Sequence, residues 1–106
     1  MLYAKTAAPP EIAPLYIGTY DINIVVNHWP DNIEQNGGVI EIWNGDFSIK
    51  LSDIIVYRTE YKEELEKDVQ DVFICSIEYD SSTNILRVEN ELGRVYFIDL
   101  ATIASA

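Results

Sequence analysis

The sequence is poor in the residues that build disulfides, metal sites and membrane anchors. Its 106 residues contain one cysteine, Cys75, and one histidine, His28. A single cysteine excludes an internal disulfide, and one histidine with one cysteine cannot supply a structural zinc site. No apolar run approaches the roughly 18 residues that a membrane-spanning helix needs. No apolar stretch follows a basic start either, so we expect no signal peptide and a cytoplasmic protein.

Basic residues are also scarce. Seven Lys and Arg stand against eighteen Asp and Glu, which gives a formal net charge of -11. Such an excess repels nucleic acid and anionic membranes and attracts basic protein surfaces. Hydrophobic residues make up 48% of the chain, which argues against disorder. The charge therefore indicates which partners are plausible and leaves the activity open.

The N-terminus is predicted to be separate from the rest. Residues 1–14 contain Pro9, Pro10 and Pro14 and favour an extended arm. Two interpretations remain open: a flexible lead-in, or an arm that docks on a partner. Residues 15–106 are expected to form a single β-rich domain.

The residues around Asn44-Gly45 predict a hairpin. Alternating apolar residues flank this pair, which is favoured in two-residue type I′ turns. That turn places Ile42 opposite Phe47 and Ile40 opposite Ile49. One face then collects the apolar residues Ile40, Ile42, Phe47, Ile49 and Leu51, while Glu41 and Lys50 share the other.

The last third of the chain predicts a meander of strands. A four-residue loop at 81–84 places Tyr79 opposite Leu86 and Glu78 opposite Arg87. A left-handed Gly93 in the next loop places Val88 opposite Tyr96. The apolar run that ends at Cys75 predicts a buried thiol in a reducing compartment.

Residues 60–70 are the helix candidate, because apolar side chains recur there at roughly helical spacing. The alternative is a long, charged hairpin excursion. The predicted fold is mostly β with about seven strands, a β-rich α+β class. The antiparallel strands form either a small sandwich or barrel, or a curved sheet with the short helix packed on it.

The same segment carries the densest charge, with six acidic residues against two lysines between positions 60 and 71. A solvated surface and a docking site for Lys and Arg are both consistent with this charge run. The predicted partner-binding residues are Glu60, Glu63, Glu64, Asp68 and Asp71, with Trp43 as an apolar anchor. Trp43 is expected on the outer face of the hairpin, where it is covered either by the arm or helix or by a partner.

Nothing in the sequence nominates a catalytic centre, a metal site or a cofactor. His28 has no nucleophile near it in sequence and is expected to be structural. The leading hypothesis is a non-catalytic protein that neutralises a basic partner, such as an immunity protein, an antitoxin or a phage-type inhibitor of a nuclease or nucleic-acid-binding protein. The alternatives are an oligomeric assembly module, such as a virion component, and a small β-barrel ligand binder or enzyme.

Overall fold

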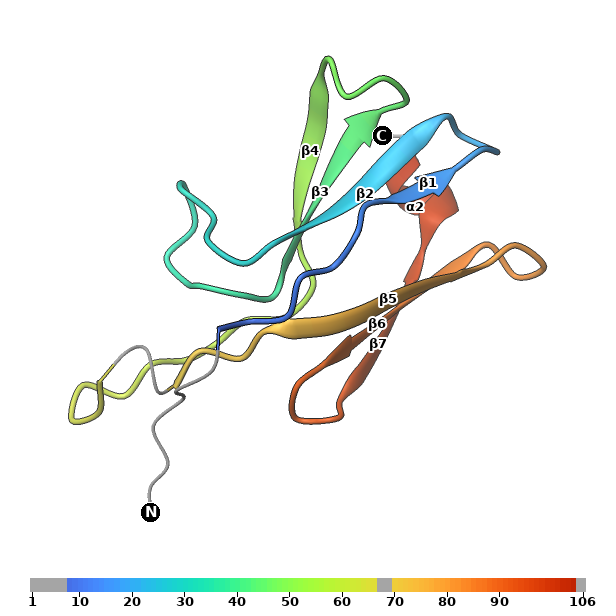
Figure 1. Ribbon diagram of the computed structural model, residues 1–106. Coiled ribbons are helices and arrows are strands. Elements are labelled where there is room, and N and C mark those ends of the chain that lie inside the picture. Colours follow the sequence, from blue (N-terminus) through green and yellow to red (C-terminus); the bar gives the residue numbers. More distant parts are fainter. Residues whose placement is uncertain (1–7, 67–69, 105–106) are drawn as a thin grey trace.

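The fold consists of two antiparallel sheets packed against each other. A computed structural model describes residues 8–66 and 70–104 (Figure 1). One sheet has four strands in the order β1-β2-β3-β4, and the other has three in the order β5-β6-β7. The elements are β1 Leu15–Ile17, β2 Ile22–Asn27, β3 Val39–Asn44, β4 Lys50–Ile55, β5 Ile74–Asp80, β6 Ile85–Asn90, β7 Val95–Asp99 and the short helix α2 Leu100–Ala104. The predicted mostly β class is confirmed, and the sheets do not close into a barrel.

One hydrophobic core joins the two sheets. In β6 buried residues alternate with half-buried ones, as expected for a strand with one face toward a core. Both sheets and the start of α2 contribute to this cluster: Ile17, Ile22, Ile24, Ile40, Ile42, Ile74, Leu86, Val88 and Leu100. Each such side chain contributes about 1.5–3 kcal/mol when it is fully buried. The sandwich form of the predicted fold is therefore the one that the chain adopts.

The predicted meander in the second sheet is confirmed. Tyr79 pairs with Leu86, and Val88 pairs with Tyr96. Gly93 has a φ of 80°, the left-handed conformation that the short loop requires. Turn chemistry and hydrophobic alternation specify the same register here, so each supports the other.

The prediction that Cys75 is buried is wrong. The register between β5 and β6 shifts between Ile74 and Ser76, so Cys75 is the extra residue of a β-bulge. Ile74 takes the core position and is fully buried, while Cys75 is exposed. A bulge moves all residues on one side of it to the opposite face, which simple alternation cannot reveal.

The predicted two-residue turn at Asn44-Gly45 is also wrong. Asn44 pairs instead with Ile49, donating its N–H to the carbonyl of Ile49 at 3.0 Å. Its side-chain oxygen accepts the N–H of Ile49 at 3.0 Å, which closes a four-residue loop. The strand that follows is β4, in which Ile54 lies opposite Ile40 and Ser52 opposite Ile42.

This change of register reverses which side chains of the second hairpin strand, after Asn44-Gly45, face the core. Phe47, Ile49 and Leu51 are 45%, 58% and 54% exposed, although the two-residue turn placed them beside the core. Ile54 and Val56 pack against the core in their place. Burial of these two side chains is worth more than the preference of Asn-Gly for a tight turn.

The described part of the N-terminal arm lies against its own chain. Residues 8–14 form no regular element, yet Ile12 packs on the core. The carbonyl of Pro10 lies 2.8 Å from Nε2 of His28. Neither a free lead-in nor a partner is needed to explain residues 8–14, while residues 1–7 lie outside the described part.

Of the helix predicted over 60–70, residues 60–66 consist of turns and irregular backbone, whereas Gln70 is helical and residues 67–69 lie outside the described part. Leu65, part of the expected apolar stripe, is 50% exposed. A helix of about 11 residues is marginal unless it docks an apolar face. The helix over 100–104 was not predicted. No helix in the described ranges is long and apolar enough to cross a membrane.

Candidate functional site

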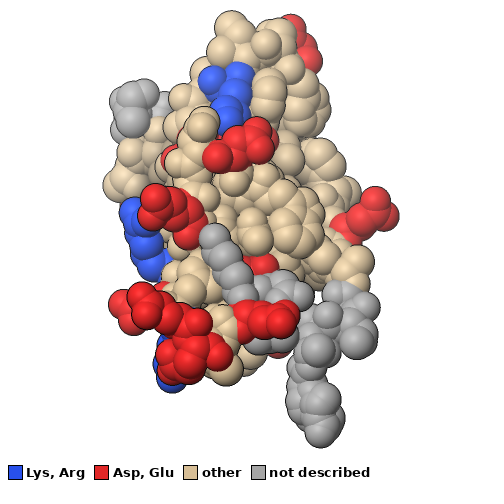
Figure 2. Space-filling model, turned by 90° about the vertical axis from the view of Figure 1, so that its left-hand side faces the viewer, with Lys and Arg blue, Asp and Glu red and all other residues tan. Residues whose placement is uncertain are grey.

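The acidic loop, defined as residues 60–66, presents its carboxylates to solvent. Glu60, Glu63, Glu64 and Glu66 are all exposed, with Lys62 among them. Figure 2 shows acidic side chains gathered toward the lower end of one face, at the level of this loop in Figure 1. Four exposed carboxylates within seven residues give this end of the protein a negative surface that favours basic groups.

The side chain of Gln70 closes the acidic loop. Its amide nitrogen donates to the carbonyls of Lys62, Leu65 and Glu66 at 3.1, 3.1 and 3.2 Å. Its oxygen accepts the N–H of Lys62 at 2.6 Å. The two N–H groups of one amide are thus shared among three backbone carbonyls, and its oxygen pairs with a fourth backbone group. The loop is held in one shape by these bonds, which lowers the entropy lost when a partner binds.

Asp71 anchors the same loop from beneath. It is 2% exposed, accepts a hydrogen bond from the hydroxyl of Tyr61 at 2.6 Å and another from the amide of Asn36 at 3.2 Å. Burial, together with the hydrogen bond to Asp71, raises the pKa of Tyr61 to about 12. The expected surface role of Asp71 is therefore corrected to a structural one. Asp68 lies outside the described residues.

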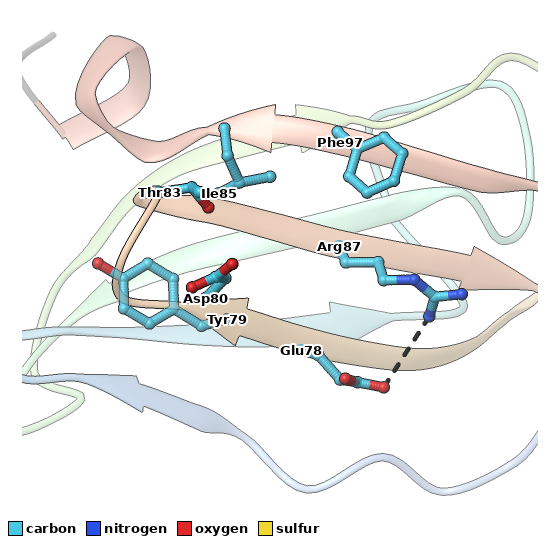
Figure 3. A pocket seen from close by; sticks show the side chains of 7 residues that line it. All are labelled: Glu78, Tyr79, Asp80, Thr83, Ile85, Arg87 and Phe97. Carbon is cyan, nitrogen blue, oxygen red and sulfur yellow. Dashed lines mark ion pairs between the residues drawn. The ribbon is translucent and has the colours of Figure 1, made fainter.

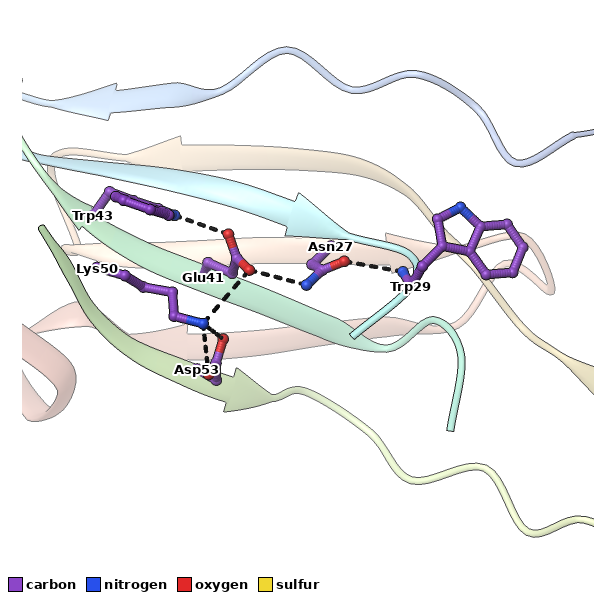
Figure 4. A network of polar contacts seen from close by, with 6 residues as sticks. All are labelled: Asn27, Trp29, Glu41, Trp43, Lys50 and Asp53. Atoms are coloured by element: carbon purple, nitrogen blue, oxygen red, sulfur yellow. Dashed lines mark hydrogen bonds and ion pairs between the residues drawn. The ribbon is translucent and has the colours of Figure 1, made fainter. Parts of the chain in front are cut away.

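Trp43 lies on the outer face of β3, as expected, where it joins a polar network (Figure 4). Its indole N–H donates to Glu41 at 2.8 Å, and the amide of Asn27 donates to the same carboxylate at 2.9 Å. Lys50 lies 3.8 Å from Glu41 and forms a closer ion pair with Asp53 at 3.1 Å. The hydrogen bond to Asp53 is the main reason that the pKa of Lys50 is raised.

This network is separate from the acidic loop. Trp43 is at the end of β3 beside the 45–49 loop, and Figure 1 shows that end of the sheet opposite the acidic loop. The expected combination of acidic stripe and tryptophan anchor on one surface is therefore not formed. Glu60, Glu63 and Glu64 are the predicted site residues that the structure does bring together on the surface.

The outer face of the second sheet holds an open hollow of about 360 Å³ (Figure 3). Phe97 and Ile85 form its apolar wall, and Arg87 approaches Glu78 to 3.9 Å at one end. Phe97 is 69% exposed, more than any other large hydrophobic residue in the described ranges. Strand alternation in the sequence does not tell whether such an outer face is covered.

His28 shows the contacts of a structural residue. Its ring packs edge-on against Phe73 with centroids 5.2 Å apart, and Nε2 contacts the arm. Within the described ranges no three His, Cys, Asp or Glu side chains are grouped so that they could hold a metal ion.

Comparison with protein families, with curated proteins and with solved structures gives no match to this chain. Its function is therefore argued from its own residues.

Proposed function

We propose that this protein is a non-catalytic, cytoplasmic binding protein that neutralises a basic partner protein. The partner class is a toxin nuclease or another nucleic-acid-binding protein, as for an immunity protein, an antitoxin or a phage-type inhibitor. One observation carries the proposal: Glu60, Glu63 and Glu64 project from a loop whose backbone is fixed by Gln70. The net charge of -11 supplies long-range attraction toward the same kind of partner.

The physical role of the loop is to form charge pairs that become strong when the partner excludes water. Exposed pairs alone contribute at most about 1 kcal/mol. Charge pairs that are close and desolvated in an interface reach about 1.5–7 kcal/mol in favourable cases. Because internal hydrogen bonds already order the acidic loop, less conformational entropy is lost when these charge pairs form.

The experiment begins with recovery of a basic protein by the tagged chain from its native lysate. Association of the purified partner is then measured against salt with the charge-reversal variant Glu60→Lys/Glu63→Lys/Glu64→Lys. The matched control, Glu11→Lys/Asp31→Lys/Glu78→Lys, changes the net charge equally at exposed positions outside the acidic loop. We expect the loop variant to slow association at least about tenfold at low salt and the control to slow it less than about threefold. Equal effects of the two variants would rule out the loop as the binding site.

The exposed edge of β7 favours a second candidate, an oligomeric assembly module. The other edge strands carry features that hinder pairing: β4 and β5 contain bulges, and β1 has three residues. β7 pairs with β6 without a register shift and contains neither proline nor lysine. The N–H of Asn90 donates to the carbonyl of Arg94, so these two residues form a hydrogen-bonded pair. Hydrogen-bonded pairs alternate along antiparallel strands, and the backbone groups of Val95, Phe97 and Asp99 therefore point away from β6.

Two copies can pair antiparallel through β7 with Phe97 opposite itself, which extends each three-stranded sheet into one of six strands. Sedimentation without any partner tests this candidate. We expect a dimer that Phe97→Lys converts to monomer, while Phe47→Lys, at a residue outside the strands, leaves it unchanged. A monomer at all concentrations would reject the assembly candidate and leave the neutralising function untouched.

A further inference from the structure

Among the described residues, two arginines form no ion pair, although the chain has eighteen acidic residues. In the described ranges Lys50 and Arg87 form ion pairs with carboxylates, whereas Arg58 and Arg94 form none. Both unpaired arginines line one pocket of about 230 Å³. Because arginine readily pairs with carboxylates, two unpaired guanidinium groups at one pocket of an acidic protein indicate a site for an anion.

The wall of the pocket is built from ordered side chains. Tyr57 and Tyr96 stack with ring centroids 5.0 Å apart and connect the segment after β4 to β7. Tyr57 also donates its hydroxyl to the carbonyl of Val72 at 2.5 Å. Burial is the main cause that raises the pKa of Tyr57. These contacts order one wall of the pocket, which Arg58 and Arg94 also line.

One buried donor group at the pocket has no partner among the described residues. Asn90 is 2% exposed, and its oxygen accepts the N–H groups of Leu92 and Arg94 at 2.9 and 3.1 Å, which orders the loop that carries Arg94. The hydroxyl of Thr59, another lining residue, is buried and has no hydrogen-bond partner in the described part of the chain. Buried polar groups without partners are rare and indicate an unfilled interaction.

We propose that this pocket binds a phosphate group, either inorganic phosphate or the phosphate of a small ester. Guanidinium groups bind phosphate oxygens in pairs, and two arginines balance its two negative charges. The exposed Leu92 at the rim offers apolar contact to the organic part of an ester. Carboxylates more than about 8 Å from the pocket weaken this attraction little, because charges that far apart are screened at physiological salt.

Glu60 lines the same pocket and repels an anion. Glu91, whose carboxylate is close enough to Tyr57 to contribute to its raised pKa, adds to this repulsion. The carboxylate of Glu60 therefore acts in opposite directions in the two proposals: it favours a basic partner and weakens phosphate binding. The Glu60→Gln variant separates them, because it should bind phosphate more tightly while it binds the basic partner less tightly.

The test is a titration of the full chain with inorganic phosphate and with phenyl phosphate, followed by amide chemical shifts and calorimetry. The site variant is Arg58→Gln/Arg94→Gln. Its matched control is Lys50→Gln/Arg87→Gln, which removes the same two positive charges outside the pocket. We expect the site variant to lose at least about tenfold in affinity, the control to stay within about twofold, and Glu60→Gln to gain severalfold.

The outcomes are distinct. Tighter binding of phenyl phosphate supports a small ester as the ligand, and equal affinities support inorganic phosphate. Absence of shifts at the pocket residues with both probes would overturn the proposal, as would an equal loss in the site variant and its control. Neither result bears on the neutralising function, which rests on the acidic loop.

Discussion

The hydroxyl of Tyr61 donates a 2.6 Å hydrogen bond to the carboxylate of Asp71, which is 2% exposed. This bond fastens the acidic loop to the body of the protein, since Tyr61 belongs to the loop and Asp71 precedes the second sheet. Tyr16 and Asp21 form a bond of the same kind at 2.8 Å, but Tyr16 is 55% exposed. The two pairs compare this bond in buried and exposed surroundings, and the Tyr61 hydroxyl additionally accepts the N–H of Asn36 at 3.1 Å.

Tyr61→Phe is expected to lower the free energy of unfolding by about 1.5–3 kcal/mol, because a buried carboxylate loses a donor that water does not replace. Tyr16→Phe is expected to lower it by less than about 1 kcal/mol, because water solvates Asp21 in its place. Urea denaturation at neutral pH measures both. Equal losses in the two variants would contradict a special role for the buried bond.

Alkaline pH should weaken the fold through the same hydroxyl. The pKa of Tyr61 is raised to about 12 in the folded protein, whereas an unfolded tyrosine has a pKa of about 10. A raised pKa stabilises the fold below about pH 10, and this contribution is lost as pH rises toward 12. Tyr57 also ionises late, because burial raises its pKa, so absorbance of tyrosinate should show one late-ionising tyrosine fewer in Tyr61→Phe than in the native protein. An unchanged late amplitude in that variant would show that the assignment to Tyr61 is wrong.

Glu41 should contribute more to stability than Asp53, although both contact Lys50. The side chain of Glu41 is 15% exposed and also accepts bonds from Asn27 and Trp43, whereas that of Asp53 is 36% exposed. We expect Glu41→Ala to cost about 1–3 kcal/mol, because two donors lose their acceptor. Asp53→Ala is expected to cost less than about 1 kcal/mol. Denaturant unfolding of both variants measures the two losses in the free energy of unfolding. A larger loss for Asp53→Ala would contradict this ranking.

Gly93 and Gly37 should respond differently to substitution by alanine, although both have positive φ. An added Cβ at Gly93 meets nothing within 4 Å, whereas at Gly37 it would lie 2.4 Å from the carbonyl oxygen of Val72. Gly93→Ala is expected to cost about 1–2 kcal/mol from backbone strain alone. Gly37→Ala should cost more, because the backbone of two segments must separate. Thermal unfolding compares the variants, and equal melting temperatures would contradict the contact.

Cys75 should react with a thiol reagent in the native protein. The β-bulge places its side chain at the surface, so one equivalent is expected to be modified without denaturant. If the Cys75 thiol reacts only after the protein unfolds, its side chain is buried, as simple strand alternation predicts.

The register of the second sheet was predictable because two local signals agree there. The loop at 81–84 and the left-handed Gly93 specify the same pairing as the apolar alternation of β5 to β7. In the first sheet the local signals compete. Asn44-Gly45 favours a tight turn, and only the packed core shows that Ile54 fills the position that this turn assigns to Ile49.

The partner-binding residues show the same division. The acidic character follows from composition, and the position of the charge run at 60–71 follows from the residue order. The sequence could not separate the exposed Glu60 and Glu63 from the buried Asp71, because Tyr61 and Asn36 reach that carboxylate only in the folded protein.

The amino-acid sequence by itself determined the net charge, the mostly β class and the pairing of the last three strands, because these depend on composition and on contacts between neighbouring segments. The tertiary structure alone decided which carboxylates reach solvent, which strand edge stays open and which arginines share a pocket. Those features depend on how the two sheets share one core, and burial of side chains distant in sequence is stronger there than any single local preference.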